Sequence, residues 1–267
     1  MSTSNAGRLA GRTALITGAT GYLGTFMSRA LAREGAHVRV NARRLDAAQA
    51  LVAEIEAEGG KASPAVFDVR DARAVEAFAG ELEARGEALH ILINNAAAGR
   101  GGTLETASDQ DYADAYDIAV VAAQRLMRVL LPALRRGRAE LGDAAILNVS
   151  SMYGLVSPDL RSYDAPEASN PPFYGAAKAA LVQLTRYGAC QLGPEGIRCN
   201  AIAPGAFPSP ATQQSAPDMV ERLRARVPLG RIGEGGEIAG PVVFLCSPEA
   251  SYITGAVLCV DGGWTAW

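Results

Sequence analysis

The chain has few of the residues that build metal centres or disulfide frameworks. Its 267 residues include only two histidines and four cysteines. Neither histidine stands near a second kind of ligand, and the cysteines lack the paired spacing of a metal site, so we expect no metal. Each cysteine lies in an apolar or strand-like context, which favours buried free thiols in a reducing cytoplasm. The four are Cys190, Cys199, Cys246 and Cys259.

Long apolar runs and basic stripes are missing as well. No apolar run approaches the length that spans a bilayer, and the N-terminus lacks the pattern of a signal peptide. The net charge is −3, which argues against nucleic acid and anionic membranes as partners. These absences predict a cytoplasmic protein that acts on a small molecule.

Apolar runs and helical segments alternate along most of the chain. This alternation indicates βαβ units and a parallel sheet covered by helices on both faces. No composition shift marks a boundary, so we expect one doubly wound α/β domain, a three-layer Rossmann fold, over residues 1–267. Within it we expect residues 1–8 to be disordered, one long helix over 108–136, and a loop over 206–217. The predicted strands cover residues 12–17, 36–41, 62–67, 89–93, 144–149, 197–202 and 257–260.

Glycines recur directly after the first predicted strand, between Thr17 and Gly24. Glycine lets the backbone turn tightly and approach a pyrophosphate, which the start of the following helix binds through free N–H groups and its dipole. The alternative is a tight turn without a ligand. The predicted phosphate-binding residues are Gly18, Thr20, Gly21, Tyr22, Leu23 and Gly24.

The end of the second predicted strand lacks the acidic residue that would hold a ribose 2′-hydroxyl. Arg43 and Arg44 follow Asn41 and Ala42 there. A guanidinium pairs with a 2′-phosphate, which a carboxylate would repel. The pattern therefore favours NADP(H) over NAD(H), and the alternative is that both arginines merely end the strand in solvent.

A tyrosine and a lysine stand one turn apart at the start of a predicted helix over 173–192. Tyr174 and Lys178 are i and i+4 and so share a face. A phenol needs its pKa lowered by roughly three units to exchange protons near neutrality, and an ammonium about 4 Å away supplies an effect of that size. Taken alone, such a pair is more often part of a solvated helix surface.

Several motifs follow one another in a fixed order along the chain. They are the glycine turn, Asp68-Val69, Asn94-Asn95-Ala96-Ala97, Asn148-Val149-Ser150-Ser151, Tyr174 with Lys178, Pro204-Gly205, and the closing Ile253-Thr254-Gly255 and Val260-Asp261-Gly262-Gly263. Together they resemble the single-domain branch of the short-chain dehydrogenase/reductase superfamily. The resemblance runs from about residue 11 to residue 263 and implies that Tyr174 passes a proton to the substrate oxygen. It also implies that Ser151 hydrogen-bonds the substrate carbonyl, and that Lys178 lowers the tyrosine pKa and binds ribose.

The resemblance also implies a cofactor cleft and an oligomer. Asp68 and Val69 would hold the adenine, and a homo-oligomer, a tetramer or dimer, would form through the long helix and the Tyr174 helix. Of the adjacent serines, Ser151 would be active and Ser150 structural. Further residues implied to contact the cofactor are Asn95, Ala96, Ala97, Pro204, Gly205 and Phe207.

Three departures from the family pattern stand out. The glycines at 18, 21 and 24 have the spacing of the superfamily's longer sugar-nucleotide branch, and Tyr22 stands where glycine is usual. Ala119 takes the place of an asparagine that holds a water of the proton relay, so Asp117 or solvent would complete it. The segment 157–172 is inserted before Tyr174 and should lie over the active-site mouth, where Tyr163 or Arg161 would touch substrate; the alternative is a surface insertion without a part in the chemistry.

The sequence therefore predicts an oxidoreductase that moves a hydride between NADP(H) and a carbonyl or secondary alcohol. Its substrate pocket would be built from residues 97–107, 152–172 and 206–217. One alternative is epimerisation, dehydration or NAD-dependent oxidation of a sugar derivative on the same site. The other is a dinucleotide-binding regulator without catalysis.

Overall fold

A computed structural model describes residues 7–97 and 100–267 of the chain. Residues 1–6, from the segment expected to be disordered, and Ala98 and Gly99, from the predicted pocket, lie outside the described residues. Arg8 is held in place, because its backbone N–H and its guanidinium donate to the Glu34 carboxylate at 3.0 and 2.6 Å. The expectation of disorder therefore does not extend to Arg8.

Seven parallel strands form one sheet in the order β3-β2-β1-β4-β5-β6-β7. β1 has neighbours on both sides, with Ile16 opposite Val40 and Ile93. Every residue of β4, β5 and β6 is buried, which explains why these strands are mostly apolar in the sequence. The predicted doubly wound sheet is confirmed. The strands are Thr13–Ile16 (β1), His37–Ala42 (β2), Lys61–Val66 (β3), Ile91–Asn94 (β4), Ala144–Val149 (β5), Ile197–Pro204 (β6) and Val257–Val260 (β7).

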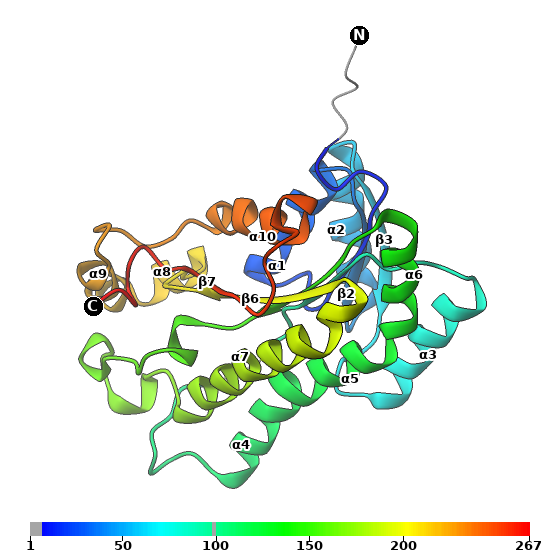
Figure 1. Cartoon of the computed structure of the whole chain (residues 1–267). Coiled ribbons are helices and arrows are strands. Elements are labelled where there is room, and N and C mark those ends of the chain that lie inside the picture. The colour runs from blue at the N-terminus through cyan, green and yellow to red at the C-terminus, as the bar shows by residue number, and fades with distance from the viewer. Residues whose placement is uncertain (1–6, 98–99) are drawn as a thin grey trace.

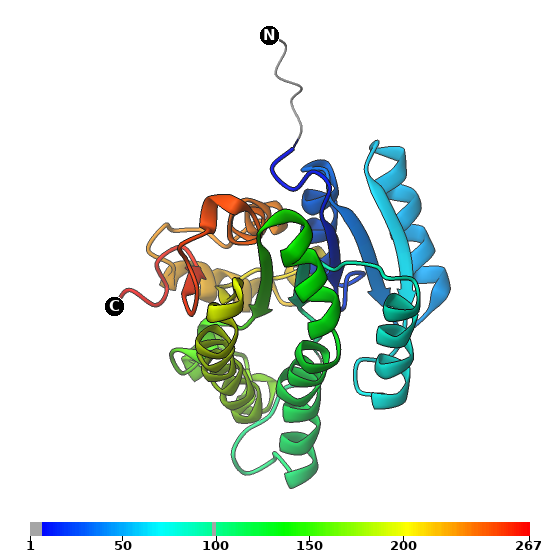
Figure 2. The same ribbon diagram turned by 45° about the vertical axis from the view of Figure 1, so that its right-hand side comes forward.

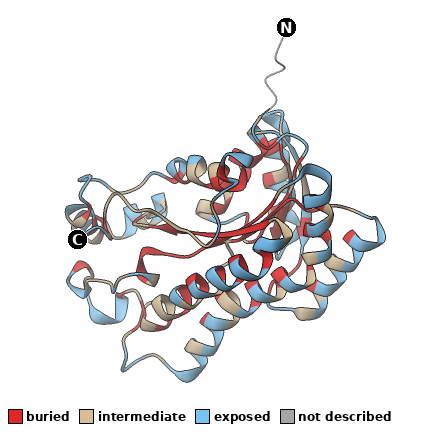
Figure 3. Ribbon diagram, viewed as in Figure 1, coloured by how far each residue is buried: buried red, intermediate tan, exposed pale blue. Residues whose placement is uncertain are grey.

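Helices cover both faces of the sheet (Figure 1). One face carries α1 (Tyr22–Arg33), α2 (Leu45–Ala57) and α10 (Ala239–Cys246), whose buried residues pack with those of the strands. The other carries α3 (Ala72–Ala84), α7 (Pro172–Leu192) and the helices between them. Figure 3 shows the buried strands between helices whose outer faces are exposed.

The long helix expected over 108–136 is divided into four parts. α4 (Asp109–Tyr116) runs into a π-helical turn at Asp117–Val121, then α5 (Ala122–Val129) and α6 (Leu131–Leu141) follow in one column (Figure 2). The break between α5 and α6 lies at Leu130, just before Pro132. Proline lacks an N–H group and its ring clashes with the preceding turn, so an unbroken helix cannot pass this point.

The segment expected to be a loop over 206–217 contains a short helix, α8 (Pro210–Ser215). Ser209 caps it by accepting from the backbone N–H of Thr212, and Pro210 fits the first turn, where no N–H partner is needed. α9 (Pro217–Arg226) follows directly. In the parts of the chain that the structure describes, no helix is long and apolar enough to cross a bilayer.

Candidate active site

A cleft of about 510 Å³ opens at the carboxyl ends of the strands. It includes the loops after β1 and β4, where the strand order reverses and where open α/β sheets bind ligands. Most of the residues predicted from the sequence meet there. They are Gly18, Thr20, Gly21, Tyr22, Leu23, Gly24, Arg43, Asp68, Val69, Asn95, Ala96, Ala97, Ser151, Tyr174, Lys178, Pro204 and Gly205.

Two predicted cofactor residues, Arg44 and Phe207, do not line the cleft. Arg44 continues the extended backbone after Arg43, so its side chain turns to the opposite side, where it is 73% exposed and pairs with Asp46 at 3.2 Å. Phe207 packs over Gly233, where a Cβ would lie 2.5 Å from the ring, and it lines a separate depression. The sequence identified the right segments but not the direction of these two side chains.

The glycine turn is built for close approach of a ligand. Gly18 has a positive φ of 59°, and a Cβ on it would lie 3.0 Å from Cα of Ala96. A Cβ on Gly24 would lie 2.4 Å from the carbonyl oxygen of Gly18. No side chain caps the start of α1, because its N-cap residue is Gly21. The first N–H groups of the helix therefore face the cleft without a capping partner. These features fit the pyrophosphate of a dinucleotide.

Tyr22 stands at a position where the family usually has glycine, but its side chain does not close the turn. Its ring leans on Phe26 in an edge-to-face contact, with the ring centroids 5.5 Å apart. Phe26 in turn packs on Gly235, where a Cβ would lie 2.2 Å from the ring. The tyrosine thus extends along α1, and its place in the turn is compatible with a bound phosphate.

Thr17 and Asn95 join the loop after β1 to the loop after β4, where the strand order of the sheet reverses. The Thr17 hydroxyl accepts from the backbone N–H groups of Asn95 and Ala96 at 2.9 and 3.1 Å. The Asn95 amide donates to the carbonyl oxygens of Thr17 and Gly18 at 2.9 and 3.0 Å. Asn95 therefore shapes the floor of the cleft.

The end of β2 presents a cation and no acid. Asn41 is buried, and its amide donates to the carbonyl oxygens of Ala65 and Phe67. Arg43 is exposed on the cleft, and no carboxylate among the described residues lies within ion-pairing distance of it. Asp68 is engaged by the guanidinium of Arg70, which holds the pKa of that carboxyl below its usual range.

Tyr174 and Lys178 come from the first turns of α7, and Ser151 from the end of β5. The lysine Nζ donates to the carbonyl oxygen of Val149 at 2.8 Å and lies 5.6 Å from the Tyr174 ring centroid. Ser150 also borders the cleft, but its hydroxyl is engaged in a hydrogen bond that it donates to the Lys178 carbonyl at 2.9 Å. The spacing in the sequence therefore brings the three predicted catalytic residues together.

The pKa of Tyr174 is shifted in the direction opposite to the one expected from the sequence. Burial raises the pKa of Tyr174, and a hydrogen bond with Ser151 offsets only part of that rise. Burial also lowers the pKa of Lys178 from 10.5 to about 8. The lysine was expected to lower the tyrosine pKa, but burial is the dominant effect here, and the ammonium donates to the Val149 carbonyl instead.

The π-helical turn lies where the relay asparagine was expected. Ala119 is buried and borders a void of about 10 Å³ together with Asn94, whose Oδ1 is buried without a partner in the described structure. Asp117 does not border the cleft; its carboxylate faces Arg125 at 3.9 Å. Of the two substitutes considered for the relay asparagine, the geometry therefore favours solvent over Asp117.

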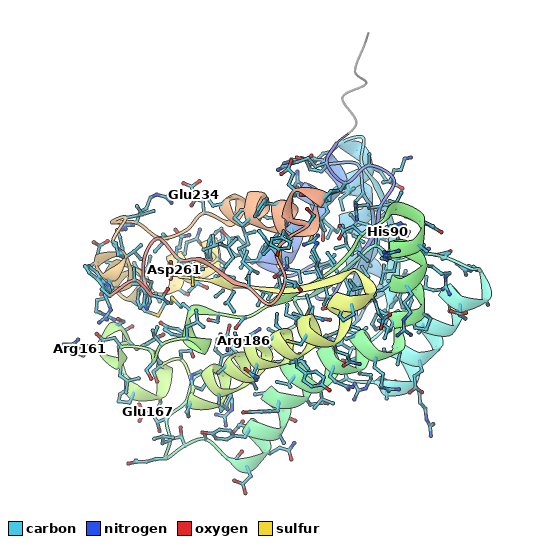
Figure 4. All side chains as sticks on the ribbon, in the orientation of Figure 1. His90, Arg161, Glu167, Arg186, Glu234 and Asp261 are labelled. Carbon is cyan, nitrogen blue, oxygen red and sulfur yellow. The ribbon has the colours of Figure 1, made fainter. Side chains whose placement is uncertain are left out.

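The insertion 157–172 is clamped to α9, at the end of the molecule where α8, α9 and the C-terminus gather (Figure 1). Asp159 pairs with Arg226, and Asp164 with Arg222, which also donates to the carbonyl oxygen of Ser162. Arg161 is directed outward and is 87% exposed (Figure 4). Contrary to the expectation, Arg161 does not face the cleft.

Several residues of the cleft escaped the sequence reasoning. Asn41 and Ala42 line the cleft at the end of β2, and Arg70 lines it two residues after the predicted contact Asp68. Their closeness in sequence to predicted residues is the signal by which they could have been found. Ile118 reaches the cleft from the π-helical turn, which the sequence pattern does not predict. Phe67 and Val149 also border the cleft; Phe67 stands directly before the Asp68-Val69 motif, and Val149 lies within the Asn148–Ser151 motif but was not predicted to contact the cofactor.

Comparison with known families agrees with this geometry. Residues 18–265 match the family model described as enoyl-(acyl carrier protein) reductase. The chain belongs to this family, and with it to the short-chain dehydrogenase/reductase superfamily of oxidoreductases.

Relatives align with this chain almost end to end. A 2,5-dichloro-2,5-cyclohexadiene-1,4-diol dehydrogenase of Sphingobium indicum is 34% identical, over 97% of this chain and 98% of the relative. A 3-oxoacyl-(acyl-carrier-protein) reductase of Staphylococcus aureus is also 34% identical, over 94% and 97%. The structure of a gluconate 5-dehydrogenase from Burkholderia cenocepacia, in complex with NADP and tartrate, has a TM-score of 0.84 and 30% identity and covers 97% of both chains. The protein is therefore an oxidoreductase of this superfamily.

Proposed function

We propose that the protein transfers a hydride between NADP(H) and a carbonyl or secondary alcohol. The observation that carries this proposal is the meeting of Ser151, Tyr174 and Lys178 in the same cleft as the glycine turn. A phosphate-binding end and a proton-donating end in one cleft suit a nicotinamide dinucleotide beside a small substrate.

Each residue of the group has a role that its surroundings support. Tyr174 keeps its proton at neutral pH, because its pKa is raised, and so is poised to donate it to a carbonyl oxygen. The Ser151 hydroxyl stabilises charge that develops on that oxygen. Lys178 has one acceptor in the described structure, the Val149 carbonyl, which leaves N–H donors for ribose hydroxyls. The bound nicotinamide supplies or accepts the hydride.

The preference for NADP(H) rests on Arg43. It is the cation on the cleft at the end of β2, and the acid that would repel a 2′-phosphate is absent there. Among similar structures, the Burkholderia cenocepacia dehydrogenase holds NADP. Arg44 has no part in this proposal, since it is paired with Asp46 outside the cleft.

Replacement of Tyr174 by phenylalanine tests the proposal. Tyr174→Phe removes only the hydroxyl, so turnover with NADPH should fall by roughly 10²- to 10⁴-fold while NADPH binding persists. Tyr252→Phe is the control, because Tyr252 is fully exposed and does not line the cleft. Full turnover in the Tyr174 variant would reject the proposed chemistry, whereas dinucleotide binding without turnover of any substrate by the wild-type protein would favour a regulator without catalysis.

A second candidate is oxidation or epimerisation of a sugar-like alcohol on the same residues. The spacing of Gly18, Gly21 and Gly24 favours it, as do two relatives named as dehydrogenases of a diol and of gluconate. Cofactor turnover separates the candidates, because net reduction consumes NADPH, net oxidation forms it, and epimerisation leaves its amount unchanged.

We further propose a cytoplasmic homo-oligomer, a tetramer or dimer, formed through the α4–α6 segment and α7. Exposed apolar side chains on these elements support it, namely Tyr116 and Val121 on the first and Tyr187 on the second. The four cysteines form no disulfide, which suits a reducing compartment, although only Cys199 and Cys246 are buried as expected.

A further inference from the structure

A carboxylate lies close to the place where Arg43 enters the cleft. Arg43 follows β2 and Asp68 comes shortly after β3, and both residues line the cleft. The two strands are neighbours, with Ala42 opposite Val66. The pairing continues past the strand ends, because the backbone N–H of Phe67 donates to the carbonyl oxygen of Ala42 at 3.1 Å. Asp68 is therefore a near neighbour of the cation on which the preference for NADP(H) rests.

Arg70 engages this carboxylate from the same turn of the chain. Its backbone N–H and its Nε donate to Oδ1 of Asp68 at 2.9 and 3.4 Å, and its Nη2 donates to Oδ2 at 3.1 Å. The turn is anchored from α5, because Nη1 of Arg125 donates to the carbonyl oxygens of Val69 and Arg70 at 2.9 and 3.2 Å. Arg70, and to a smaller extent Arg43, hold the pKa of the Asp68 carboxyl below its usual range. Asp68 is thus an anion at neutral pH whose charge the guanidinium of Arg70 balances.

An unbalanced carboxylate at this place would oppose the binding of NADP(H). A phosphate monoester carries a charge of about −1.5 to −2 at pH 7, and the proposed function places the 2′-phosphate at Arg43. A free Asp68 carboxylate nearby would repel that charge. The 2′-hydroxyl of NAD(H) is uncharged and would not be repelled. The balance between Asp68 and Arg70 therefore bears on the choice of cofactor rather than on dinucleotide binding as such.

We propose that Arg70 determines cofactor specificity together with Arg43, because it neutralises Asp68 and so permits the 2′-phosphate to bind. The inference rests on the proposed function and deepens it, since the cation that receives the phosphate depends on a second cation beside it. Selection between NADP(H) and NAD(H) is then set by two cations and one anion on neighbouring loops.

The dissociation constant for NADH divided by that for NADPH tests this inference, because contacts with adenine affect both cofactors and cancel in the ratio. We would measure both constants by nicotinamide fluorescence for the wild-type protein, Arg70→Ala, Asp68→Asn and the double variant. Arg70→Ala leaves the carboxylate unbalanced and should lower the ratio by about three- to tenfold. Asp68→Asn should not lower it. The double variant removes the two opposite charges together and should return the ratio to within about twofold of wild type.

Two further variants separate this role from a structural one. Arg70→Lys keeps the charge and should keep most of the wild-type ratio. Arg73→Ala is the matched control, since Arg73 stands three residues further on, is exposed and does not line the cleft. It changes the net charge of the protein by the same amount as Arg70→Ala and should leave the ratio unchanged. Retained NADH binding by Arg70→Ala shows that this variant is folded.

The outcomes distinguish this inference from the function on which it rests. A wild-type ratio well above one that Arg70→Ala leaves unchanged overturns the role of Arg70 alone. A double variant whose ratio is as low as that of Arg70→Ala also overturns it, because Arg70 would then act on the phosphate without Asp68. A wild-type ratio at or below one overturns the proposed preference for NADP(H), and with it this inference.

Discussion

Lys178 is a charged residue of the candidate site that is almost fully buried, with only 3% of it exposed. An ammonium without an opposite charge nearby is costly in such a place, so burial lowers its pKa to about 8. The residue therefore reduces the stability of the cofactor-free fold at neutral pH. Its retention beside Tyr174 is understandable if ribose hydroxyls take up its free N–H donors.

The pH dependence of stability tests this account of Lys178. Between about pH 8 and pH 10.5 the unfolded chain binds a proton that the folded chain does not, so wild-type stability rises with pH in this window. Relative to Lys178→Met, the wild-type free energy of unfolding should therefore increase by roughly 3 kcal/mol from pH 7 to pH 10.5. Urea unfolding of both cofactor-free proteins measures it, and a difference independent of pH would contradict the lowered pKa.

Residue identity was predictable at this site, whereas residue environment was not. Ser151, Tyr174 and Lys178 follow from motif order, and the structure brings them together. The direction of the Tyr174 pKa depends on burial by residues far away in the sequence, which an i, i+4 spacing does not contain. The outward turn of Arg44 is likewise a property of the extended backbone rather than of its neighbours in sequence.

At the scale of elements, ion pairs join α9 and the insertion into one unit. Arg226 joins three parts of the chain, because it pairs with Asp159 and lies 5.4 Å from the Trp264 ring centroid. A small apolar cluster that includes Leu223 and Val227 lies beneath it. The ion pairs therefore fix an insertion that contains only short 3₁₀ turns.

Loss of Arg226 should loosen this unit. Arg226→Ala removes both the ion pair and the cation–π contact, so we expect a loss of about 1 kcal/mol in the free energy of unfolding and a higher KM for substrate. Arg224→Ala is the control, since Arg224 pairs only with Glu221 on the exposed face of α9, and it should stay within about 0.5 kcal/mol of wild type. Equal effects of the two changes would argue against the clamp.

Strands and helices were predicted correctly from the sequence where their apolar residues recur at a regular spacing. They were missed where the structure depends on a local feature of the backbone. The strands and α7 were predictable, because buried runs and helical spacing are visible in the sequence. The π-helical turn at Asp117–Val121 preserves the apolar face of its helix, so periodicity gives no sign of it. α8 was missed because it is short and polar, although Ser209 and Pro210 together form a recognisable helix start.

At the scale of the molecule, the outer faces of the α4–α6 segment and α7 expose apolar side chains that a monomer would leave in water. We predict that sedimentation gives a mass of two or four copies of the 27.7 kDa chain. Val121→Glu, at a position that is 43% exposed, should shift the protein toward smaller species without unfolding it. A wild-type monomer at all concentrations would contradict the proposed assembly.

The central claim is a dinucleotide cleft whose Arg43 selects the 2′-phosphate. Titration of NADPH and NADH against the purified protein, followed by nicotinamide fluorescence, tests it most directly. The account predicts tighter binding of NADPH, and an Arg43→Ala variant that loses about 10- to 100-fold in NADPH affinity while NADH affinity is nearly unchanged. Preference for NADH, or no effect of Arg43→Ala on either cofactor, would contradict it.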